Sequence, residues 1–264
     1  MNILDEIIAY KKAEVEEKKK MVSLEQLKDS EAYNKTSLKL SKCITEKNVP
    51  AVIAEYKRKS PSKGWFTKAE LEDVVTNYFM QGASAISILT DNHFFGGSLE
   101  DLILARKLVL CPLLRKDFIV DTYQIHETKA AGADIILLIA AALTPTQVKE
   151  MAREAKEIGL EVLLEIHNEV EALCICNEVD FAGVNNRNLK TFDVDIKRSV
   201  ELIKYIPTDK IAISESGIDS VEAIKMLHAT GYKGFLIGEK FMKAPQPQEA
   251  FTTFMTALKE INEN

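Results

Sequence analysis

The chain has 264 residues, of which 46% are hydrophobic and 28% are charged. This balance is typical of a soluble globular protein and excludes a collagenous, low-complexity or intrinsically disordered chain. The formal net charge of -6 and the absence of a Lys/Arg block disfavour nucleic acid as a partner, because binding a phosphate backbone requires clustered cations.

The first 20 residues carry both signs of charge and lack the apolar core of a signal peptide. The longest apolar run, residues 135–143, is less than half of the ~20 residues that a membrane-spanning helix requires. Four irregularly spaced cysteines predict neither a disulfide framework nor a zinc site. We therefore expect a cytoplasmic protein that does not associate with membranes.

Residues 1–45 differ from the rest of the chain, because apolar residues recur there at helical spacing among Lys and Glu. No strand-like run interrupts this pattern. We expect these residues to form a helical N-terminal extension of a single domain that spans residues 1–264. The apolar positions are Ile3, Leu4, Ile7, Ile8 and Val15.

From about residue 50 onward, eight short apolar runs are separated by helical stretches. None of the runs alternates with polar residues, as expected for strands of a parallel sheet that is buried on both faces. Their spacing is that of consecutive βα units. The predicted strands are residues 51–55, 85–89, 112–115, 134–139, 161–165, 181–184, 211–214 and 234–237.

Four glycines support the same division of the chain. Gly82, Gly132, Gly159 and Gly231 each follow a helical stretch and precede a predicted strand, as expected where a helix ends at a left-handed residue. Eight βα units predict an α/β fold of the (β/α)8 barrel type. The alternative is an open doubly wound sheet, which normally carries a G-x-G-x-x-G turn after its first strand. Residues 57–64 lack that pattern, so the barrel is favoured.

Charged and amide residues follow five of the predicted strands, at the ends where a barrel of this kind has its active site. Counting alternate residues back along a strand places these side chains on one face with apolar residues, for example Glu165 with Leu163. Because burying an unpaired charge is costly, we expect the set to converge on one functional site. The set consists of Glu55, Lys57, Lys116, Glu165, Asn185, Arg187 and Glu215.

Two glycine-containing segments predict a phosphate site. Ser216 and Gly217 follow the seventh strand, and Gly238 follows the eighth. In barrels, the loops at these two positions often hold a phosphate group through backbone N–H groups, which glycine allows to approach closely. Ser60, in the loop after the first strand, is a further candidate donor, although serine is also common in turns.

The sequence does not indicate a metal site or an acyl-transfer site. The four histidines show no H-x-H or H-E-x-x-H spacing, and no G-x-S-x-G segment occurs. His93 and His167 follow strand ends, where they either line the mouth of the barrel or have a structural or solvated role.

The segment I-A-E-Y-K-R-K-S-P-S at residues 53–62 is highly specific. With the other strand ends, it resembles the indole-3-glycerol-phosphate synthases of tryptophan biosynthesis, and the resemblance extends over essentially the whole chain. The other matching segments are residues 87–91, 95–98, 115–119, 164–166, 183–189, 214–218 and 235–239.

The resemblance implies a (β/α)8 barrel and a specific reaction. The family closes and decarboxylates 1-(2-carboxyphenylamino)-1-deoxyribulose 5-phosphate, giving indole-3-glycerol phosphate, carbon dioxide and water. It uses neither a metal nor an organic cofactor. The expected partner is therefore a small phosphorylated substrate, and we expect the protein to be a monomer or a weak homodimer.

The resemblance also implies roles for individual residues. Lys116 matches the family's acid for ring closure and Glu165 its base, while Glu55 and Lys57 assist. By the same matching, Asn185 orients substrate hydroxyls, Glu215 holds the lysine network, Arg187 and Lys57 attract the substrate's carboxylate end, and Phe95, Phe118 and Leu189 surround the anthranilate ring.

The phosphate end departs from the family pattern at one position. Family members often carry Ser after the glycine of the eighth strand, and Glu239 stands there in this chain. Backbone contact from Ser216, Gly217, Gly238 and Glu239, rather than a hydroxyl group, is therefore the expected interaction with phosphate.

Two other kinds of protein remain as alternatives. The first is another phosphosugar-binding barrel, of the phosphoribosylanthranilate isomerase or ribulose-phosphate epimerase type, although the Cys/Asp or His/Asp sets of those enzymes are not visible. The second is a barrel that binds phosphate without catalysis, which should have lost some of the charged strand ends.

Overall fold

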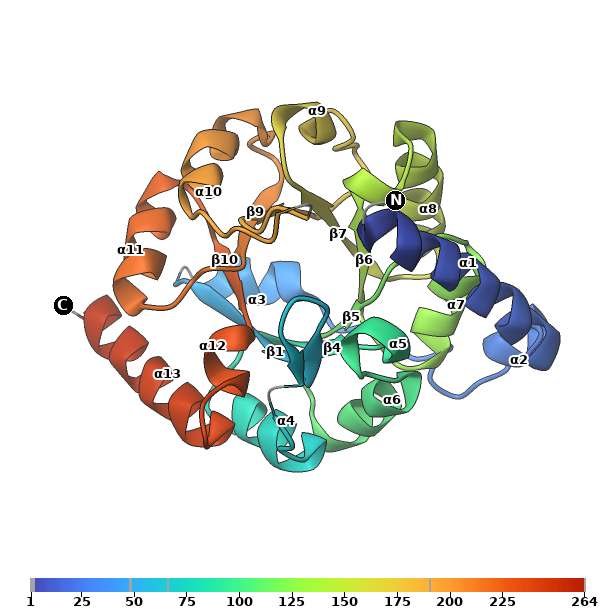
Figure 1. The fold of residues 1–264 in the computed structure, drawn as a ribbon, viewed down its shortest axis with the longest axis horizontal. Helices are drawn as coiled ribbons and strands as arrows, with labels where there is room; N and C mark the ends of the chain where they lie inside the picture. Colours follow the sequence, from blue (N-terminus) through green and yellow to red (C-terminus); the bar gives the residue numbers. More distant parts are fainter. Residues whose placement is uncertain (1–2, 48, 66, 190, 264) are drawn as a thin grey trace.

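The computed structural model describes residues 3–47, 49–65, 67–189 and 191–263; residues 1 and 2 of the predicted extension lie outside this part. Eight parallel strands close into a barrel in the order β1-β10-β9-β8-β7-β6-β5-β4, inside a ring of helices (Figure 1). The predicted (β/α)8 fold is therefore confirmed. The strands are β1 (Ala51–Tyr56), β4 (Ala85–Leu89), β5 (Leu113–Lys116), β6 (Ile135–Ile139), β7 (Glu161–Ile166), β8 (Phe181–Asn185), β9 (Ile211–Glu215) and β10 (Gly234–Ile237).

Each barrel strand is followed by at least one helix, as the βα spacing predicts. The helices after the strands are α4 (Leu71–Met80), α5 (Asn92–Phe95), α6 (Leu99–Leu108), α7 (Tyr123–Ala130), η1 (Ala140–Ala142), α8 (Pro145–Glu157), α9 (Glu169–Ala172), α10 (Lys197–Leu202), η2 (Ile203–Tyr205), α11 (Val221–Thr230), α12 (Glu239–Met242) and α13 (Pro247–Glu263). No helix in the described part of the chain is long and apolar enough to cross a membrane.

The eight predicted strands agree with the observed ones to within one residue at each end. Gly82, Gly132, Gly159 and Gly231 all have positive φ, so the prediction of left-handed residues after these helices is also confirmed. A short hairpin between β1 and α4 was not predicted. It pairs β2 (Lys59–Ser60) with β3 (Gly64–Trp65), two strands too short to leave an apolar pattern.

The interior of the barrel is filled by one row of side chains from each strand. Ile53, Leu114, Leu163 and Ile213 are essentially inaccessible to solvent and belong to one apolar cluster. The prediction that the charged strand ends face inward depended on the phase of these residues, and the structure places them inside the barrel. The alternate residues of the strands, such as Val52, form a second cluster with the surrounding helices.

The N-terminal extension forms three helices, α1 (Ile3–Met21), α2 (Leu24–Lys28) and α3 (Leu40–Lys47). Leu40 of α3 joins the apolar cluster inside the barrel, so α3 closes its amino-terminal end. Two buried carboxylates hold the chain there: Asp134 accepts a hydrogen bond from the backbone N–H of Leu38, and Glu161 accepts one from that of Leu40, both at 2.7 Å.

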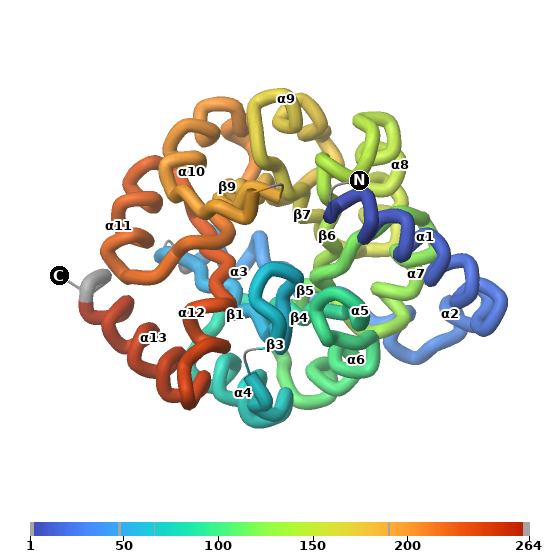
Figure 2. Tube along the Cα trace, in the orientation of Figure 1, coloured from blue at the N-terminus to red at the C-terminus, as the bar shows by residue number. Residues whose placement is uncertain are grey.

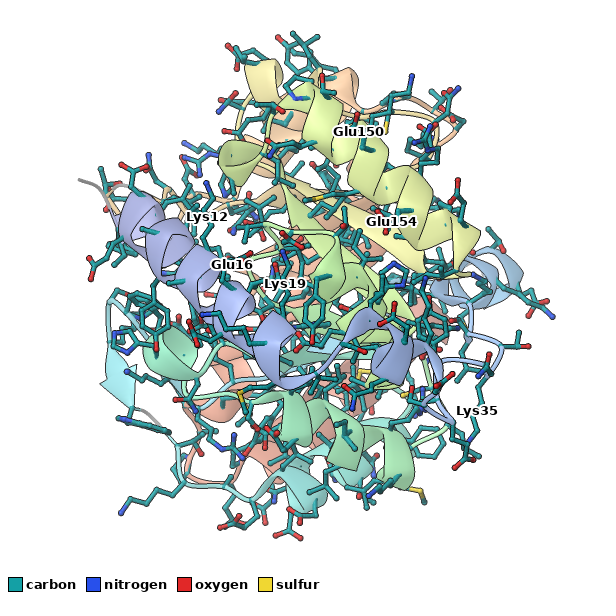
Figure 3. The ribbon with its side chains drawn as sticks, turned by 90° about the vertical axis from the view of Figure 1, so that its right-hand side faces the viewer. Lys12, Glu16, Lys19, Lys35, Glu150 and Glu154 are labelled. Atoms are coloured by element: carbon teal, nitrogen blue, oxygen red, sulfur yellow. The ribbon has the colours of Figure 1, made fainter. Side chains whose placement is uncertain are left out.

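Helix α1 lies on the opposite side of the barrel, in front of the strand ends in Figures 1 and 2. Figure 3 shows its course along the side of the molecule, marked by Lys12, Glu16 and Lys19. On its inner side, the side chain of Lys11 is 1% exposed, and its ammonium group lies 2.9 Å from Asp91 and 3.0 Å from Asp117. Asp117 directly follows β5, and Asp91 lies two residues after the end of β4. A buried ion pair network therefore joins the extension to the mouth of the barrel.

Lys11→Met tests this network. The substitution leaves the buried carboxylate of Asp91 without the Lys11 cation and leaves that of Asp117 paired with Arg115 alone, so we expect the free energy of unfolding to fall by about 3–5 kcal/mol. Urea unfolding followed by circular dichroism measures the change. Lys20→Met is the matched control, because Lys20 and its partner Glu17 are 68% and 70% exposed and such pairs contribute little. Equal stability of the two variants would contradict this account.

Candidate active site

A cavity of about 590 Å³ opens at the carboxyl ends of the barrel strands. This volume is suited to a ligand of the size of a small metabolite. The structure brings together here every residue that the sequence predicted for the site. These are Glu55, Lys57, Ser60, Phe95, Lys116, Phe118, Glu165, Asn185, Arg187, Leu189, Glu215, Ser216, Gly217, Gly238 and Glu239.

Lys116 occupies the centre of the charged set. Its ammonium group lies 2.7 Å from a carboxylate oxygen of Glu165 and 2.7 Å from one of Glu215. The three residues come from β5, β7 and β9, alternate strands whose side chains meet in one layer inside a barrel. The amide of Asn185 donates a hydrogen bond of 3.1 Å to the other oxygen of Glu165. One lysine is thus held between two buried carboxylates.

The burial of this group shifts its protonation equilibria. Burial raises the pKa of Glu215 to about 7, with the nearby Glu165 adding to the shift and Lys116 opposing it. Burial alone would raise the pKa of Glu165, but Lys116 and His167 hold this pKa well below its ordinary range. Burial alone would lower the pKa of Lys116, yet Glu165 and Glu215 raise it. These shifts favour the protonated form of Lys116 and the ionised form of Glu165, while burial favours the neutral form of Glu215.

Two glycines make room for the acidic side chains. A Cβ atom at Gly183 of β8 would overlap the carboxylate of Glu215 on the neighbouring strand. A Cβ atom at Gly238 would lie 2.6 Å from Oε1 of Glu55. Glu55 in turn pairs with Lys57 at 2.6 Å. The carboxylates therefore reach the centre of the mouth because these neighbouring positions carry no side chain.

The loop after β9 has an unusual backbone. Ser216 and Gly217 have φ of 66° and 72°, so two successive residues lie in the left-handed region. For Ser216 this conformation costs on the order of 1–3 kcal/mol, and such strain tends to occur at functional sites. A Cβ atom at Gly217 would overlap Val194, so glycine is needed there for space as well as conformation.

Cations gather at the same end of the cavity, around Glu239. Its carboxylate pairs with Arg187 at 2.9 Å, with Lys243 at 2.5 Å, and with Lys63 of the β2–β3 turn. Burial acts against ionisation, but Lys243, Lys63 and Arg187 lower the pKa of Glu239 to about 2. Arg187 and Lys57, predicted to attract one substrate carboxylate together, each contact a different protein carboxylate in this structure.

The opposite end of the cavity is apolar. The rings of Phe95 and Phe118 face each other with centroids 6.0 Å apart, and Leu189 adds to the wall. Asp91 fixes the position of Phe95 by capping α5, since it accepts a hydrogen bond of 3.3 Å from the Phe95 backbone N–H. Cationic and apolar ends therefore flank the central lysine.

Comparison with known proteins agrees with this geometry. The chain matches the family model described as indole-3-glycerol phosphate synthase over residues 4–254. The indole-3-glycerol phosphate synthase of Bacteroides thetaiotaomicron is 48% identical, with 98% of this chain and 99% of that protein covered. The protein of the same name from Aliarcobacter butzleri is 43% identical, with 97% and 99% covered.

The chain belongs to the indole-3-glycerol phosphate synthase family. The family and the carboxy-lyase activity predicted from the sequence are thereby confirmed.

Solved structures of other proteins resemble the chain in fold alone. Thiamine phosphate pyrophosphorylase from Pyrococcus furiosus gives a TM-score of 0.59 at 15% identity, covering 82% of this chain and 98% of that one. The alpha subunit of tryptophan synthase from Legionella pneumophila gives 0.61 at 12% identity, covering 85% and 98%.

Several residues that line the cavity of this synthase were not predicted as site residues. Ile3, Leu4 and Ile7 of α1 reach the cavity from the extension, and Lys63 and Lys243 contribute cations. The helical spacing of Ile3, Leu4 and Ile7 predicts an apolar helix face, but it does not predict that this face lies at the mouth of the barrel. The sequence indicated Lys243 only weakly, because its position four residues after Glu239 is the spacing of an ion pair along a helix. Among the described residues, no group of three or more His, Cys, Asp or Glu is placed to hold a metal ion.

Gly183→Ala tests the space requirement of Glu215. The new methyl group pushes the carboxylate away from Lys116, and we expect kcat to fall about 100-fold, as small displacements of catalytic groups do. Gly234→Ala is the control, because the nearest atom that its methyl group would meet is a side-chain carbon of Ile213 at 3.0 Å, outside the charged group. Steady-state kinetics with a thermal melt of each variant separates activity from stability. Retention of wild-type kcat by Gly183→Ala would show that the contact is dispensable.

Proposed function

We propose that the cavity catalyses the conversion of 1-(2-carboxyphenylamino)-1-deoxyribulose 5-phosphate to indole-3-glycerol phosphate, carbon dioxide and water, with Lys116, Glu165 and Glu215 at its centre. The observation that carries this assignment is the protonated Lys116 held at 2.7 Å from both carboxylates. An acid and a base thus lie within reach of the same reacting atoms.

The two ends of the cavity suit the two ends of this substrate. The aromatic ring packs between Phe95, Phe118 and Leu189, beside the apolar face of α1. The phosphate group binds to backbone N–H groups of Ser216, Gly217 and Gly238 together with the surrounding cations. The hydroxyl group of Ser60 is buried without a partner among the described residues, which suits it to bind the substrate.

Ring closure requires a proton at the oxygen of the ribulose carbonyl group. As the ring carbon that bears the carboxylate attacks the carbonyl carbon, the electron pair of the C=O bond moves to the oxygen, which takes a proton from Lys116. Loss of carbon dioxide then returns the electron pair to the aromatic ring. These two steps move protons and carbon dioxide and need no electron acceptor.

Dehydration completes the indole. The hydroxyl group formed in ring closure takes a proton from the ammonium group of Lys57 and leaves as water, while Glu165 removes a proton from the adjacent carbon. The Glu55–Lys57 pair assists from β1, and Asn185 orients the hydroxyl groups of the sugar chain. Glu215, with its pKa near 7, holds the ammonium group of Lys116 in place and exchanges protons with it between steps.

Lys116→Met tests the assignment of the acid. We expect turnover to fall by at least about 1,000-fold, because ring closure loses its proton donor. Indole fluorescence measures turnover, and calorimetric titration with inorganic phosphate is expected to show unchanged binding at the phosphate end. Lys156→Met is the control, since Lys156 also pairs with a carboxylate, that of Asp180 at 2.5 Å, but lies outside the cavity. Near-normal turnover of Lys116→Met would exclude Lys116 as the acid.

Glu239 occupies the position at which the three cations converge, so the substrate phosphate must replace its carboxylate there. Glu239→Gln removes this internal competitor, and we expect the Kd for inorganic phosphate to fall several-fold, because charge-assisted contacts of the three cations become available. Glu222→Gln on α11 changes the net charge equally but lies outside this cavity and serves as the control. Weaker phosphate binding by Glu239→Gln would instead assign Glu239 a role in positioning the cations.

The remaining predictions about the molecule stay part of this proposal. We expect residues 1–264 to act as a single domain, in the cytoplasm, as a monomer or a weak homodimer. No cofactor, metal ion, nucleic acid or membrane is needed for the proposed steps. The support for these points is the composition, the acidic net charge and proton chemistry that side chains alone supply.

A further inference from the structure

His167 lies directly behind the proposed base. It follows β7, its side chain is 9% exposed, and its Nε2 atom is 3.2 Å from Oε1 of Glu165. The other oxygen of Glu165 contacts Lys116 at 2.7 Å. The Glu165 carboxylate is therefore held between two cationic groups, one on the substrate side and one on the far side.

Glu171 on α9 fixes the imidazole ring from behind. One of its oxygens lies 2.9 Å from Nδ1 of His167 and accepts a hydrogen bond of 2.8 Å from the His167 backbone N–H. Its other oxygen accepts a hydrogen bond of 2.6 Å from the side chain of Asn168, the residue that caps α9. Both oxygens of Glu171 are thus engaged, and the orientation of the ring is determined.

The surroundings of His167 favour the imidazolium form. Burial lowers its pKa, but Glu165 and Glu171 outweigh this effect and raise the pKa to about 9. The charged groups placed against the ring, among the described residues, are Glu165 from β7 and Glu171 from α9. Helix η1 packs on both elements and consists of three alanines, so it adds no charge.

We propose that His167, held by Glu171, is a positioning residue that keeps the Glu165 carboxylate ionised after Lys116 has passed its proton to the substrate. This inference rests on the roles proposed above for Lys116 and Glu165. Once Lys116 becomes neutral, Glu165 loses the positive charge at one of its oxygens. The imidazolium at the other oxygen remains, so Glu165 stays available as the base for the final step.

His167→Gln separates charge from contact, because a glutamine amide donates a hydrogen bond but carries no charge. Loss of the cation raises the pKa of Glu165, so the acid limb of the kcat–pH profile moves to higher pH. We expect kcat to fall about ten-fold on the acid limb of the profile, with KM unchanged. His126→Gln is the matched control, because His126 also lies 2.9 Å from a glutamate, Glu154, but is remote from the cavity.

Glu171→Gln provides a second test that leaves His167 in place. We expect the same direction of change with a smaller amplitude, and the double variant should behave like His167→Gln alone, because Glu171 acts through His167. Thermal melts confirm that each variant is folded. If His167→Gln does not fold, the pH profile of Glu171→Gln decides the question.

Glu165→Gln distinguishes this inference from the assignment on which it rests. If Glu165→Gln retains turnover, Glu165 is not the base and the proposed function must be revised. If Glu165→Gln is inactive while His167→Gln and Glu171→Gln keep the wild-type kcat and acid limb, the role of His167 alone is overturned. A shift caused equally by His126→Gln would show a general effect of histidine replacement and would also overturn it.

Discussion

The arrangement of the mouth depends on one buried ion group, Lys116 between Glu165 and Glu215. Taking three ionisable side chains out of water costs several kcal/mol for each ion, and mutual contact offsets this cost only when the geometry is close to ideal. A closed barrel meets this requirement, because β5, β7 and β9 deliver their side chains to one layer and the strands cannot slide relative to one another. Gly183 on β8 completes the arrangement by leaving the space that Glu215 occupies. The same contacts that make the group tolerable in the core set the protonation states that proton transfer requires.

Charge balance extends over the whole mouth. Lys57 is paired with Glu55, Lys116 with two carboxylates, and Arg187 with Glu239. A doubly anionic substrate therefore enters a site whose cations already have partners within the protein. Binding of the substrate breaks these internal ion pairs and replaces them with contacts to the substrate. The net binding free energy is therefore smaller than the number of cations suggests. A ligand that cannot replace the internal carboxylates binds even more weakly. This exchange favours specificity over raw affinity, and it explains how several cations remain close together in the free protein.

Much of the fold and of the site could be predicted from the sequence, for one physical reason. Strands of a parallel barrel are buried on both faces, so each appears as a continuous apolar run, and polar residues immediately after such runs must lie at one end of the barrel. Lys116 and Glu215 were therefore recognisable from local sequence alone. The hairpin of β2 and β3 was not, because its strands have two residues each. The pairing of Glu239 with Arg187 and Lys63 and the role of Gly183 in making space were also out of reach, since both depend on side chains that meet only in three dimensions.

The N-terminal extension shows why local pattern is insufficient for placement. Its apolar residues predict helices, yet α3 closes one end of the barrel through Leu40 while α1 lies along the rim of the other end, beside β6 and α7. The buried carboxylates that hold it, Glu161 at the bottom and Asp117 at the mouth, are separated from their partners by more than a hundred residues of chain. Because Asp117 directly follows Lys116 and its carboxylate accepts the backbone N–H of Phe118, the contact with Lys11 fixes the segment that carries the proposed acid. The extension is therefore part of the framework that positions the reacting groups, and the buried Lys11 couples its stability to the geometry of the mouth.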